Sequence, residues 1–161
     1  TVTAWFANNP SIKTTTTFKK LETIQTEVIY ASSEEVGDGD AKNLVDGDPA
    51  TYWHSMYSVT VAKYPHWVDL DAGEVKTIKG FTYMPRQDSY NGNVKEYTIH
   101  VSMDGKNWGE PVQKGTFAGN RDEKKVIFSQ PVKGRYIRFT ALSEQYGQDY
   151  ASGAELTILA E

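Results

Sequence analysis

Short apolar stretches alternate with turn signals along the chain from Glu22 onward, and no stretch keeps helical spacing for three turns. The segment 66–71 alternates strictly, with Val68 and Leu70 on one face and Asp69 and Asp71 on the other, as a half-buried strand does. Similar patterns predict strands at 66–71, 77–84, 97–103, 125–129, 135–141 and 156–159. Six or more strands without helices between them predict an all-β fold, an antiparallel β-sandwich.

An atypical first segment and two long loops interrupt this pattern. Residues 1–22 hold Asn-Asn-Pro and a run of four threonines, so we expect a linker, or the tail of a preceding domain that adds a peripheral strand. The domain itself is expected at 23–161. Residues 31–65 and 85–94 are polar and contain little regular structure. Loops this long in a compact domain are usually functional or organised by a metal.

Composition narrows the class of protein. The 161 residues include no cysteine, which excludes disulfides and thiolate zinc sites, and 12% are aromatic, far too many for a disordered chain. Seventeen Lys and Arg against 21 Asp and Glu give a net charge of −4 without a basic block, which disfavours nucleic acid. No apolar run approaches the roughly 20 residues of a membrane span. The segment Thr1 to Phe6 has no signal-peptide pattern, so we expect a cut from a longer chain.

The strongest local cluster is the segment 43–51, NLVDGDPAT. Asp46 and Asp48 stand two residues apart, and Gly47 and Pro49 force a tight turn that gathers oxygen atoms. Hard cations such as calcium take six to eight oxygens, and such a turn can supply most of them. The distal glutamate of an EF-hand is missing. Both readings stay open on spacing alone: a calcium site, or a turn that is merely solvated.

The aromatic segment that follows offers a second candidate site. Trp53 is expected in the core, as is Trp67, whereas His54 and Tyr57 can face solvent together from a loop. Arg86 and Asn91, with Gln87 between them, add hydrogen-bond donors on the other long loop. An exposed ring beside such groups suits a neutral polyol with one apolar face, namely a sugar. The alternative is that His54 has a purely structural role and contacts no ligand.

Catalysis finds less support. Glycoside hydrolysis requires two carboxyl groups across a cleft. The candidates Glu34, Glu35, Asp38 and Asp40 share one polar stretch that is more typical of a solvated loop. A serine triad has only three histidines to draw on, of which His66 and His100 have no obvious serine or acid partner in the sequence, and no nucleophile elbow is present. The chain is therefore expected not to be an enzyme.

Taken together, six segments resemble the coagulation factor 5/8 type C (discoidin-like) family in its carbohydrate-binding module family 32 branch. They run in family order and cover roughly residues 24–161: NLVDGDPATYWHS (43–55), YPHWVDLDAG (64–73), YMPRQ (83–87), YTIHVSMDGKNW (97–108), RYIRF (135–139) and AEL (154–156). The resemblance implies an eight-stranded jelly-roll sandwich of the galactose-binding-domain type.

The resemblance also implies a structural Ca²⁺ site and a sugar site. The calcium ligands carried over by motif position are Asn43, Asp46, Asp48, Thr51, Ala154 and Glu155. The ion is expected to tie the last strand to the first loop. The sugar-binding residues carried over are His54, Arg86 and Asn91 for the hydroxyls and Tyr57 for stacking, with Glu34 or Glu35, and Tyr146 or Tyr150, in addition. The trio of His, Arg and Asn favours galactose or N-acetylgalactosamine, and amino sugars of the glucosamine type stay open.

The sequence thus predicts a non-catalytic, calcium-stabilised carbohydrate-binding module of a bacterial glycoside hydrolase, secreted, periplasmic or on the cell surface. The parent catalytic domain and a glycan with a terminal sugar are the expected partners, without nucleic acid or membrane insertion. A discoidin-like adhesion or lipid-binding module is the first alternative. A small sandwich glycosidase or lyase, and a structural module whose site has decayed, are the others. Polar loop tips such as Asp38 and Asp88 argue against entry into a bilayer.

Overall fold

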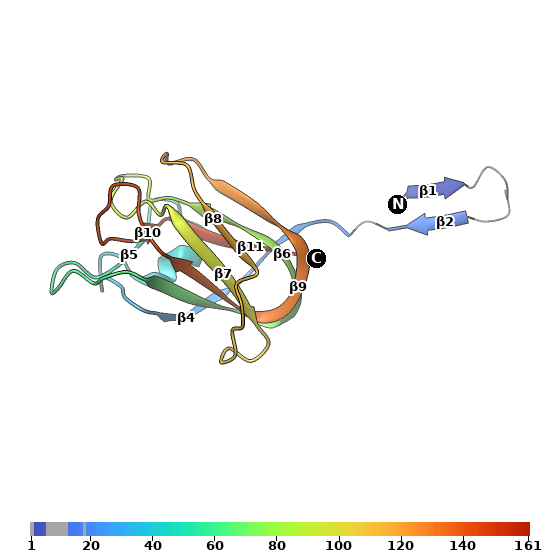
Figure 1. Ribbon diagram of the computed structural model, residues 1–161, viewed down its shortest axis with the longest axis horizontal. Helices are drawn as coiled ribbons and strands as arrows, with labels where there is room; N and C mark the ends of the chain where they lie inside the picture. Colours follow the sequence, from blue (N-terminus) through green and yellow to red (C-terminus); the bar gives the residue numbers. More distant parts are fainter. Residues whose placement is uncertain (1, 6–12, 18) are drawn as a thin grey trace.

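The computed structural model describes residues 2–5, 13–17 and 19–161 (Figure 1). Strands β1 (Val2–Trp5) and β2 (Lys13–Thr16) pair with each other in antiparallel register. Part of the expected linker, at residues 1, 6–12 and 18, lies outside the described residues. The expected domain boundary at residue 22 stays a prediction.

Two long strands run through the body of the domain and define its layers. Strand β6 (His66–Met84) and strand β9 (Lys124–Ala141) pair antiparallel along most of their length. Their register shifts between Asp71 and Lys76 and again between Ile78 and Gly80. Such irregularities bend and twist strands. The first half of β6 therefore pairs with different neighbours from the second half.

The halves of β6 and β9 belong to two facing layers, which makes the fold a sandwich. One layer joins the first half of β6 and the second half of β9 to three further strands: β4 (Glu27–Ala31), β7 (Glu96–Ser102) and β8 (Gln113–Thr116). The other joins the remaining halves to β3 (Glu22–Ile24) and β11 (Glu155–Ala160). Every strand ladder here is antiparallel. The predicted all-β sandwich is confirmed.

Several details differ from the sequence prediction. The segments 66–71 and 77–84 belong to one strand, as do 125–129 and 135–141; in β6 the residues between them include Gly73 at a φ of +81°, where the register with β9 shifts. Strands β3, β4 and β8 were not predicted. Strand β4 lacks clean alternation because its register with β6 shifts between Val28 and Tyr30. Within the described residues the helical element is a single 3₁₀ turn, η1 (Ala41–Val45), and no helix there is long and apolar enough to cross a membrane.

The core lies between the two layers and is rich in aromatic rings. Tyr97 and Phe117 stack with their ring centroids 4.2 Å apart, and Tyr83 stacks on Phe117 at 5.0 Å. Trp53 is fully buried, as predicted. The expectation for Trp67 is wrong, because this residue lies on the outer face of its sheet, where Arg138 covers its ring at 5.4 Å.

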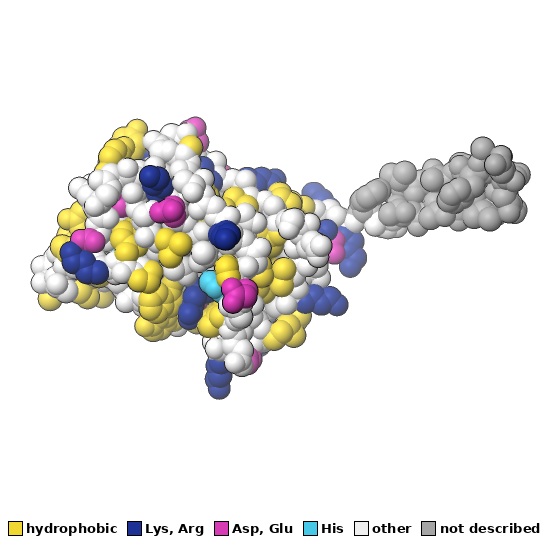
Figure 2. All heavy atoms as spheres, viewed as in Figure 1, with side chains coloured by type: hydrophobic (Ala, Val, Ile, Leu, Met, Phe, Trp, Pro, Cys, Tyr) yellow, Lys and Arg dark blue, Asp and Glu magenta, His cyan; other side chains and the backbone are white. Residues whose placement is uncertain are grey.

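Loops gather at one end of the sandwich, on the left in Figure 1, and carry the candidate site. A two-residue strand pair holds them together, β5 (Trp53–His54) with β10 (Ser152–Gly153). This pair brings segments about a hundred residues apart side by side. On the face shown in Figure 2, acidic and basic side chains are interspersed without a block of one sign, in agreement with the small net charge.

Candidate functional site: a ring-lined pocket among the loops

Five of the seven predicted sugar-site residues line one pocket of about 240 Å³. They come from β5 and three loops: His54, Tyr57, Arg86, Asn91 and Tyr150. The antiparallel pairing of His54 with Ser152 brings the loop that carries Tyr150 to this place. The structure therefore brings together side chains that span almost a hundred positions in the sequence.

Three rings form the wall of the pocket. Tyr57 meets His54 edge to face at a centroid distance of 4.9 Å, and Tyr150 lies 5.3 Å from His54. The Tyr57 hydroxyl donates to the Asp38 carboxylate, which raises the pKa of Tyr57 to about 12. Tyr57 is 38% exposed, so its ring offers an apolar surface beside polar groups.

His54 is held as a hydrogen-bond acceptor. It is only 2% exposed, and this burial lowers its pKa, so the imidazole is neutral at pH 7. Its Nδ1 lies 2.6 Å from the Ser55 carbonyl oxygen. Because a carbonyl oxygen only accepts, the proton of the neutral ring belongs on Nδ1, and Nε2 carries a free lone pair. A Cβ on Gly39 would lie 2.6 Å from the Cβ of His54, so this close packing requires glycine.

Arg86 supplies donors in a fixed orientation. Its Nε donates to Asp88 Oδ1 over 2.6 Å, and its guanidinium lies 3.8 Å above the centroid of the Tyr52 ring. A guanidinium has five N–H groups, and Asp88 occupies only part of them. Sequence reasoning missed Asp88 and Tyr52. The spacing of Arg86 and Asp88, two residues apart in one loop, was the available signal.

Asn91 and its loop are fastened to the C-terminal loop. The Asn91 carbonyl accepts a hydrogen bond from Ser152 Oγ over 2.6 Å, and Ser152 N–H donates to the Gly92 carbonyl over 2.9 Å. Gln87, which the sequence offered as a further donor, directs its amide to the carbonyls of Pro85 and Arg121. It is therefore engaged within the loop structure.

Glu35 and Tyr146 are not among the residues that line the pocket. Glu35 is 8% exposed, and its carboxylate accepts the backbone N–H groups of Tyr57 at 2.7 Å and Ser58 at 3.1 Å. The Ser58 hydroxyl also donates to it. Glu35 thus holds the segment that presents Tyr57. Tyr146 is 59% exposed and lies beside Tyr90.

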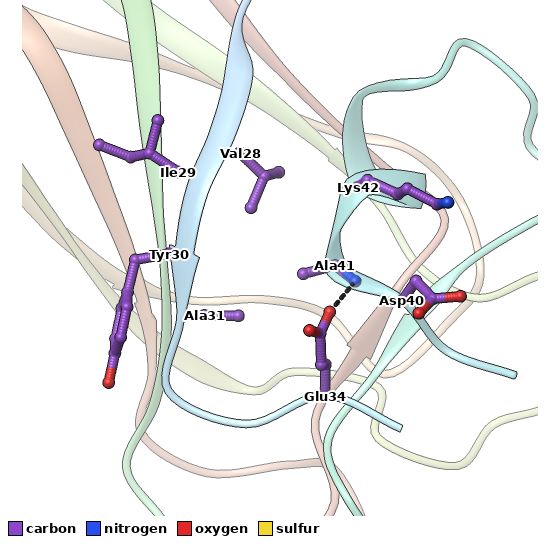
Figure 3. A pocket seen from close by; sticks show the side chains of 8 residues that line it. All are labelled: Val28, Ile29, Tyr30, Ala31, Glu34, Asp40, Ala41 and Lys42. Carbon is purple, nitrogen blue, oxygen red and sulfur yellow. Dashed lines mark hydrogen bonds between the residues drawn. The ribbon is translucent and has the colours of Figure 1, made fainter. Parts of the chain in front are cut away.

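Glu34, the alternative to Glu35, lines a separate hollow of about 280 Å³ between β4 and η1 (Figure 3). In that view its carboxylate turns toward Ala41, whose N–H donates to it over 2.7 Å. Val28 and Ala31 form the opposite wall. Its lining includes a single aromatic residue, Tyr30, and neither histidine nor arginine, so this hollow lacks the combination of side chains found in the ring-lined pocket.

The segment proposed for calcium folds into a compact turn of oxygen atoms. Thr51 Oγ1 donates to Asp46 Oδ2 over 2.6 Å, and Asp46 Oδ1 accepts the Asp48 N–H at 2.9 Å. Glu155, from the first position of β11, reaches this turn. Its carboxyl lies beside that of Asp46 and near the backbone of Gly47, and the three residues line one hollow. The first and last parts of the domain thus meet at two carboxyl groups.

Two features of this turn fit a cation. Burial and the adjacent Asp46 carboxylate raise the pKa of Glu155 to about 7, as expected where two like charges lie together without a counter-charge. Glu155 Oε1 is buried and lacks a hydrogen-bond partner among the described residues. No group of three or more His, Asp or Glu side chains suited to a metal occurs in the described part of the chain. The backbone carbonyls and Thr51 would have to supply the remaining oxygens.

Comparison with known proteins identifies relatives of the chain. Residues 28–156 match the F5/8 type C domain family. A sialidase of Micromonospora viridifaciens is 40% identical over 156 residues, 94% of this chain and 24% of the sialidase. A galactose oxidase of Gibberella zeae is 31% identical over 121 residues, 74% of this chain and 18% of that protein. The chain therefore spans a quarter or less of the length of these two relatives.

Solved structures show the same architecture. A Clostridium perfringens domain in complex with GalNAc-β-1,3-galactose superposes with a TM-score of 0.77 at 31% identity, over 85% of this chain and 99% of that domain. The family 32 carbohydrate-binding module of NanJ from C. perfringens, in complex with galactose, superposes with a TM-score of 0.77 at 27% identity. The match covers 87% of this chain and 99% of that module. The module CBM32-3 of a family 31 glycoside hydrolase from C. perfringens superposes with a TM-score of 0.78 at 35% identity. The match covers 85% of this chain and 92% of that module. The chain belongs to the F5/8 type C domain family, and its structural neighbours are carbohydrate-binding modules of family 32.

Proposed function

We propose that this domain is a non-catalytic carbohydrate-binding module that holds a parent glycoside hydrolase near glycans ending in galactose or N-acetylgalactosamine. The observation that carries the proposal is the pocket in which a fixed acceptor, His54 Nε2, a fork of donors on Arg86 and the ring of Tyr57 stand together. A sugar presents hydroxyl groups that both donate and accept, and C–H groups that pack on a ring.

The chemistry of the pocket supports recognition of one hydroxyl from two sides. In this proposal one sugar hydroxyl donates its proton to His54 Nε2 and accepts a hydrogen bond from Arg86. Asn91 forms a hydrogen bond with the adjacent hydroxyl of the same sugar. Two solved relatives at 27% and 31% identity are complexes with galactose and with GalNAc-β-1,3-galactose. We infer that the hydroxyl held between His54 and Arg86 is an axial O4. One bound sugar buries little area, so affinity for a single site should be low.

The proposal of a parent enzyme rests on the relatives of this chain. The sialidase that shares 40% identity is about four times longer than the matched segment. A module of this kind raises the effective concentration of the catalytic domain at the glycan. We infer the same arrangement here, in a bacterial protein that acts outside the cytoplasm on extracellular glycans.

We further propose that Ca²⁺ binds the turn 46–51 as a structural ion. The side chains of Asp46 and Glu155, the hydroxyl and carbonyl of Thr51, and the carbonyls of Asn43, Asp48 and Ala154 would hold it. The support is the pair of adjacent carboxyl groups and the unpartnered Glu155 Oε1. A cation there neutralises this repulsion and joins β11 to the first loop.

Nuclear magnetic resonance titration of the ¹⁵N-labelled domain tests the sugar proposal. Galactose and N-acetylgalactosamine should give saturable shifts at Tyr57, Arg86 and Asn91, whereas glucose, with an equatorial O4, should give none at equal concentration. Saturable shifts that are equal for glucose and galactose would contradict the inferred specificity. No shift with any sugar, glucosamine and N-acetylglucosamine included, would contradict sugar binding itself.

A lipid-binding discoidin-like module is the second candidate, favoured by one observation. Val59 is 86% exposed on the loop between β5 and β6, and apolar loop tips enter bilayers in membrane-binding domains. Asp38 and Asp88, exposed on neighbouring loops, oppose it. Co-sedimentation with phosphatidylserine vesicles that is lost in Val59→Asp would establish lipid binding. Its absence leaves the sugar proposal as the account of these loops.

A further inference from the structure

The pocket encloses no more than the end of a glycan. Its volume of about 240 Å³ lies below the roughly 300–1,000 Å³ of pockets that take drug-sized ligands. A terminal monosaccharide fits this scale, so the next sugar of a longer chain must lie outside, on the surface of the loops. The question is which surface it meets.

An exposed pair of tyrosines stands on the loops that form the pocket. Tyr90 is 44% exposed and Tyr146 is 59% exposed, and their rings meet edge to face with centroids 6.2 Å apart. The guanidinium of Arg121 lies 4.6 Å from the centroid of the Tyr90 ring. Large aromatic rings usually bury most of their area, so an exposed, ordered pair suggests a ligand-binding surface.

The tyrosine pair shares its loops with two residues of the pocket. Tyr90 precedes Asn91, and Tyr146 lies four residues before Tyr150. Hydrogen bonds join the two loops, from Gln145 N–H to the Asn93 carbonyl at 2.9 Å and from Ser152 Oγ to the Asn91 carbonyl. The pair is therefore attached to the framework that fixes one side of the pocket.

The loop under Tyr146 is organised by a buried carboxylate. Glu144 is 2% exposed, and its Oε1 accepts the N–H groups of Tyr146 at 2.8 Å and Gln148 at 2.5 Å. On the other loop, Arg121 Nη1 donates to the Gln87 carbonyl over 2.6 Å, which fixes the cation above Tyr90. Rings held in this way lose little conformational entropy when a ligand packs on them.

We infer that Tyr90 and Tyr146 form a second subsite, which packs on the sugar next to the terminal residue of a disaccharide or longer glycan. This inference rests on the proposed function, because it assumes that the terminal sugar occupies the pocket. It assigns the length of the ligand: the domain recognises the last two sugars rather than one.

Calorimetric titration tests the subsite with three ligands that all end in galactose: methyl β-galactoside, lactose and galactosyl-β-1,3-N-acetylgalactosamine. Aromatic contacts of this kind are worth about three- to tenfold in affinity. The disaccharide with the higher affinity should therefore bind about three- to tenfold more tightly than methyl β-galactoside. In Tyr146→Ala and Tyr90→Ala this ratio should fall to about one. Tyr30→Ala, which truncates a tyrosine of similar exposure, 52%, on β4, should leave the ratio unchanged.

The outcomes separate the two proposals. Binding of methyl β-galactoside with a ratio near one in the unaltered domain would overturn the subsite alone. A ratio that survives both tyrosine substitutions would overturn it as well. Failure of all three ligands to bind would overturn the proposed function and the subsite with it. Saturation-transfer signals from the protons of the second sugar, lost in Tyr146→Ala, would support the subsite directly.

Discussion

Asp88 holds Arg86 by two hydrogen bonds, from Nε to Oδ1 at 2.6 Å and from Nη2 to Oδ2 at 3.3 Å. The side chain of Arg86 is 15% exposed and that of Asp88 64%, so the acid stands on the solvent side of the guanidinium. The tyrosine ring of Tyr52 lies on one face of the same guanidinium. Arg86 is thus oriented before any ligand arrives, which reduces the entropy lost on binding.

Asp88→Asn should weaken galactose binding while the fold is kept. Asparagine offers one acceptor oxygen where the carboxylate offers two, so the guanidinium loses part of its orientation. A hydrogen bond that orients a ligand-binding group contributes about three- to tenfold in affinity. Calorimetric titration measures the change. Asp122→Asn, an exposed acid near Lys124, is the control, and equal losses in both variants would contradict a specific role for Asp88.

Galactose binding should stay constant down to pH 6.5, the ordinary pKa of histidine, and should fall only at a pH below that value. The burial of His54 lowers its pKa, so the ring stays neutral down to this pH and gains a proton only at lower pH. A protonated ring loses the free lone pair on Nε2 and can no longer accept from a sugar hydroxyl. Titrations from pH 7.5 down to the lowest pH at which the domain is still folded should show the loss of one acceptor. Binding that strengthens on acidification would contradict the assigned tautomer.

The burial of histidine side chains also makes the free energy of unfolding depend on pH. The binding experiment therefore needs a control for folding. His54 and His66 both have a lowered pKa in the folded state because they are buried. Below pH 6.5 the unfolded state binds more protons than the folded state, so the free energy of unfolding decreases as the pH falls. Melting curves must therefore show that the domain is still folded at each pH of the binding series.

Glu35→Gln should loosen the segment that presents Tyr57. A glutamine has a single acceptor oxygen and cannot accept from the N–H groups of Tyr57 and Ser58 and from the Ser58 hydroxyl as the carboxylate does. We expect faster hydrogen exchange at residues 57–60 and galactose binding weakened about three- to tenfold. Glu34→Gln is the matched control, because Glu34 binds the N–H of Ala41 in the separate hollow. Equal effects of both substitutions would remove the positioning role of Glu35.

Removal of calcium should lower the melting temperature. A ligand at a hundred times its Kd stabilises a folded domain by about 2.7 kcal/mol. For a chain of this size that corresponds to a shift of roughly 5–10 °C. Differential scanning calorimetry with calcium and with chelator measures the difference. An unchanged melting temperature in chelator would contradict the ion site.

Glu155→Gln provides a matched test of the same site. Glutamine removes the negative charge beside Asp46 and keeps a donor that can reach it, so the variant in chelator should be at least as stable as the unaltered domain. Calcium should then give it no further stabilisation. A variant that still gains the full shift on calcium addition would exclude Glu155 as a ligand.

The sequence predicted those features that depend on local pattern. Strict alternation at 66–71 identified the buried face with Val68 and Leu70, because a side-chain period of two is specific to strands. The strand β4 escaped notice because its register shift breaks the alternation. The alternation itself puts Trp67 on the face of Asp69 and Asp71, where Arg138 covers its ring; its expected place in the core followed from the usual burial of indole rings and not from the pattern.

For the candidate site, the sequence motifs led to residues that the fold brings together, His54, Arg86 and Tyr150 among them. The supporting contacts depend on long-range packing and could not be read from spacing. The Asp38 contact with Tyr57 and the place of Tyr52 beneath Arg86 are of this kind. Glu34 and Glu35 could not be distinguished in sequence, since adjacent side chains in an irregular loop can point to different sides.

The most direct test of sugar recognition compares galactose titrations of the unaltered domain and of Arg86→Ala, followed by ¹⁵N chemical shifts at pH 7. Hydrogen bonds to a charged group contribute about 1.5–3 kcal/mol, so loss of Arg86 should weaken binding by roughly 10- to 150-fold, below detection for a weak site. Saturable shifts are expected around the pocket in the unaltered domain and none in the folded variant. Equal saturation curves for the two proteins would exclude sugar binding through Arg86.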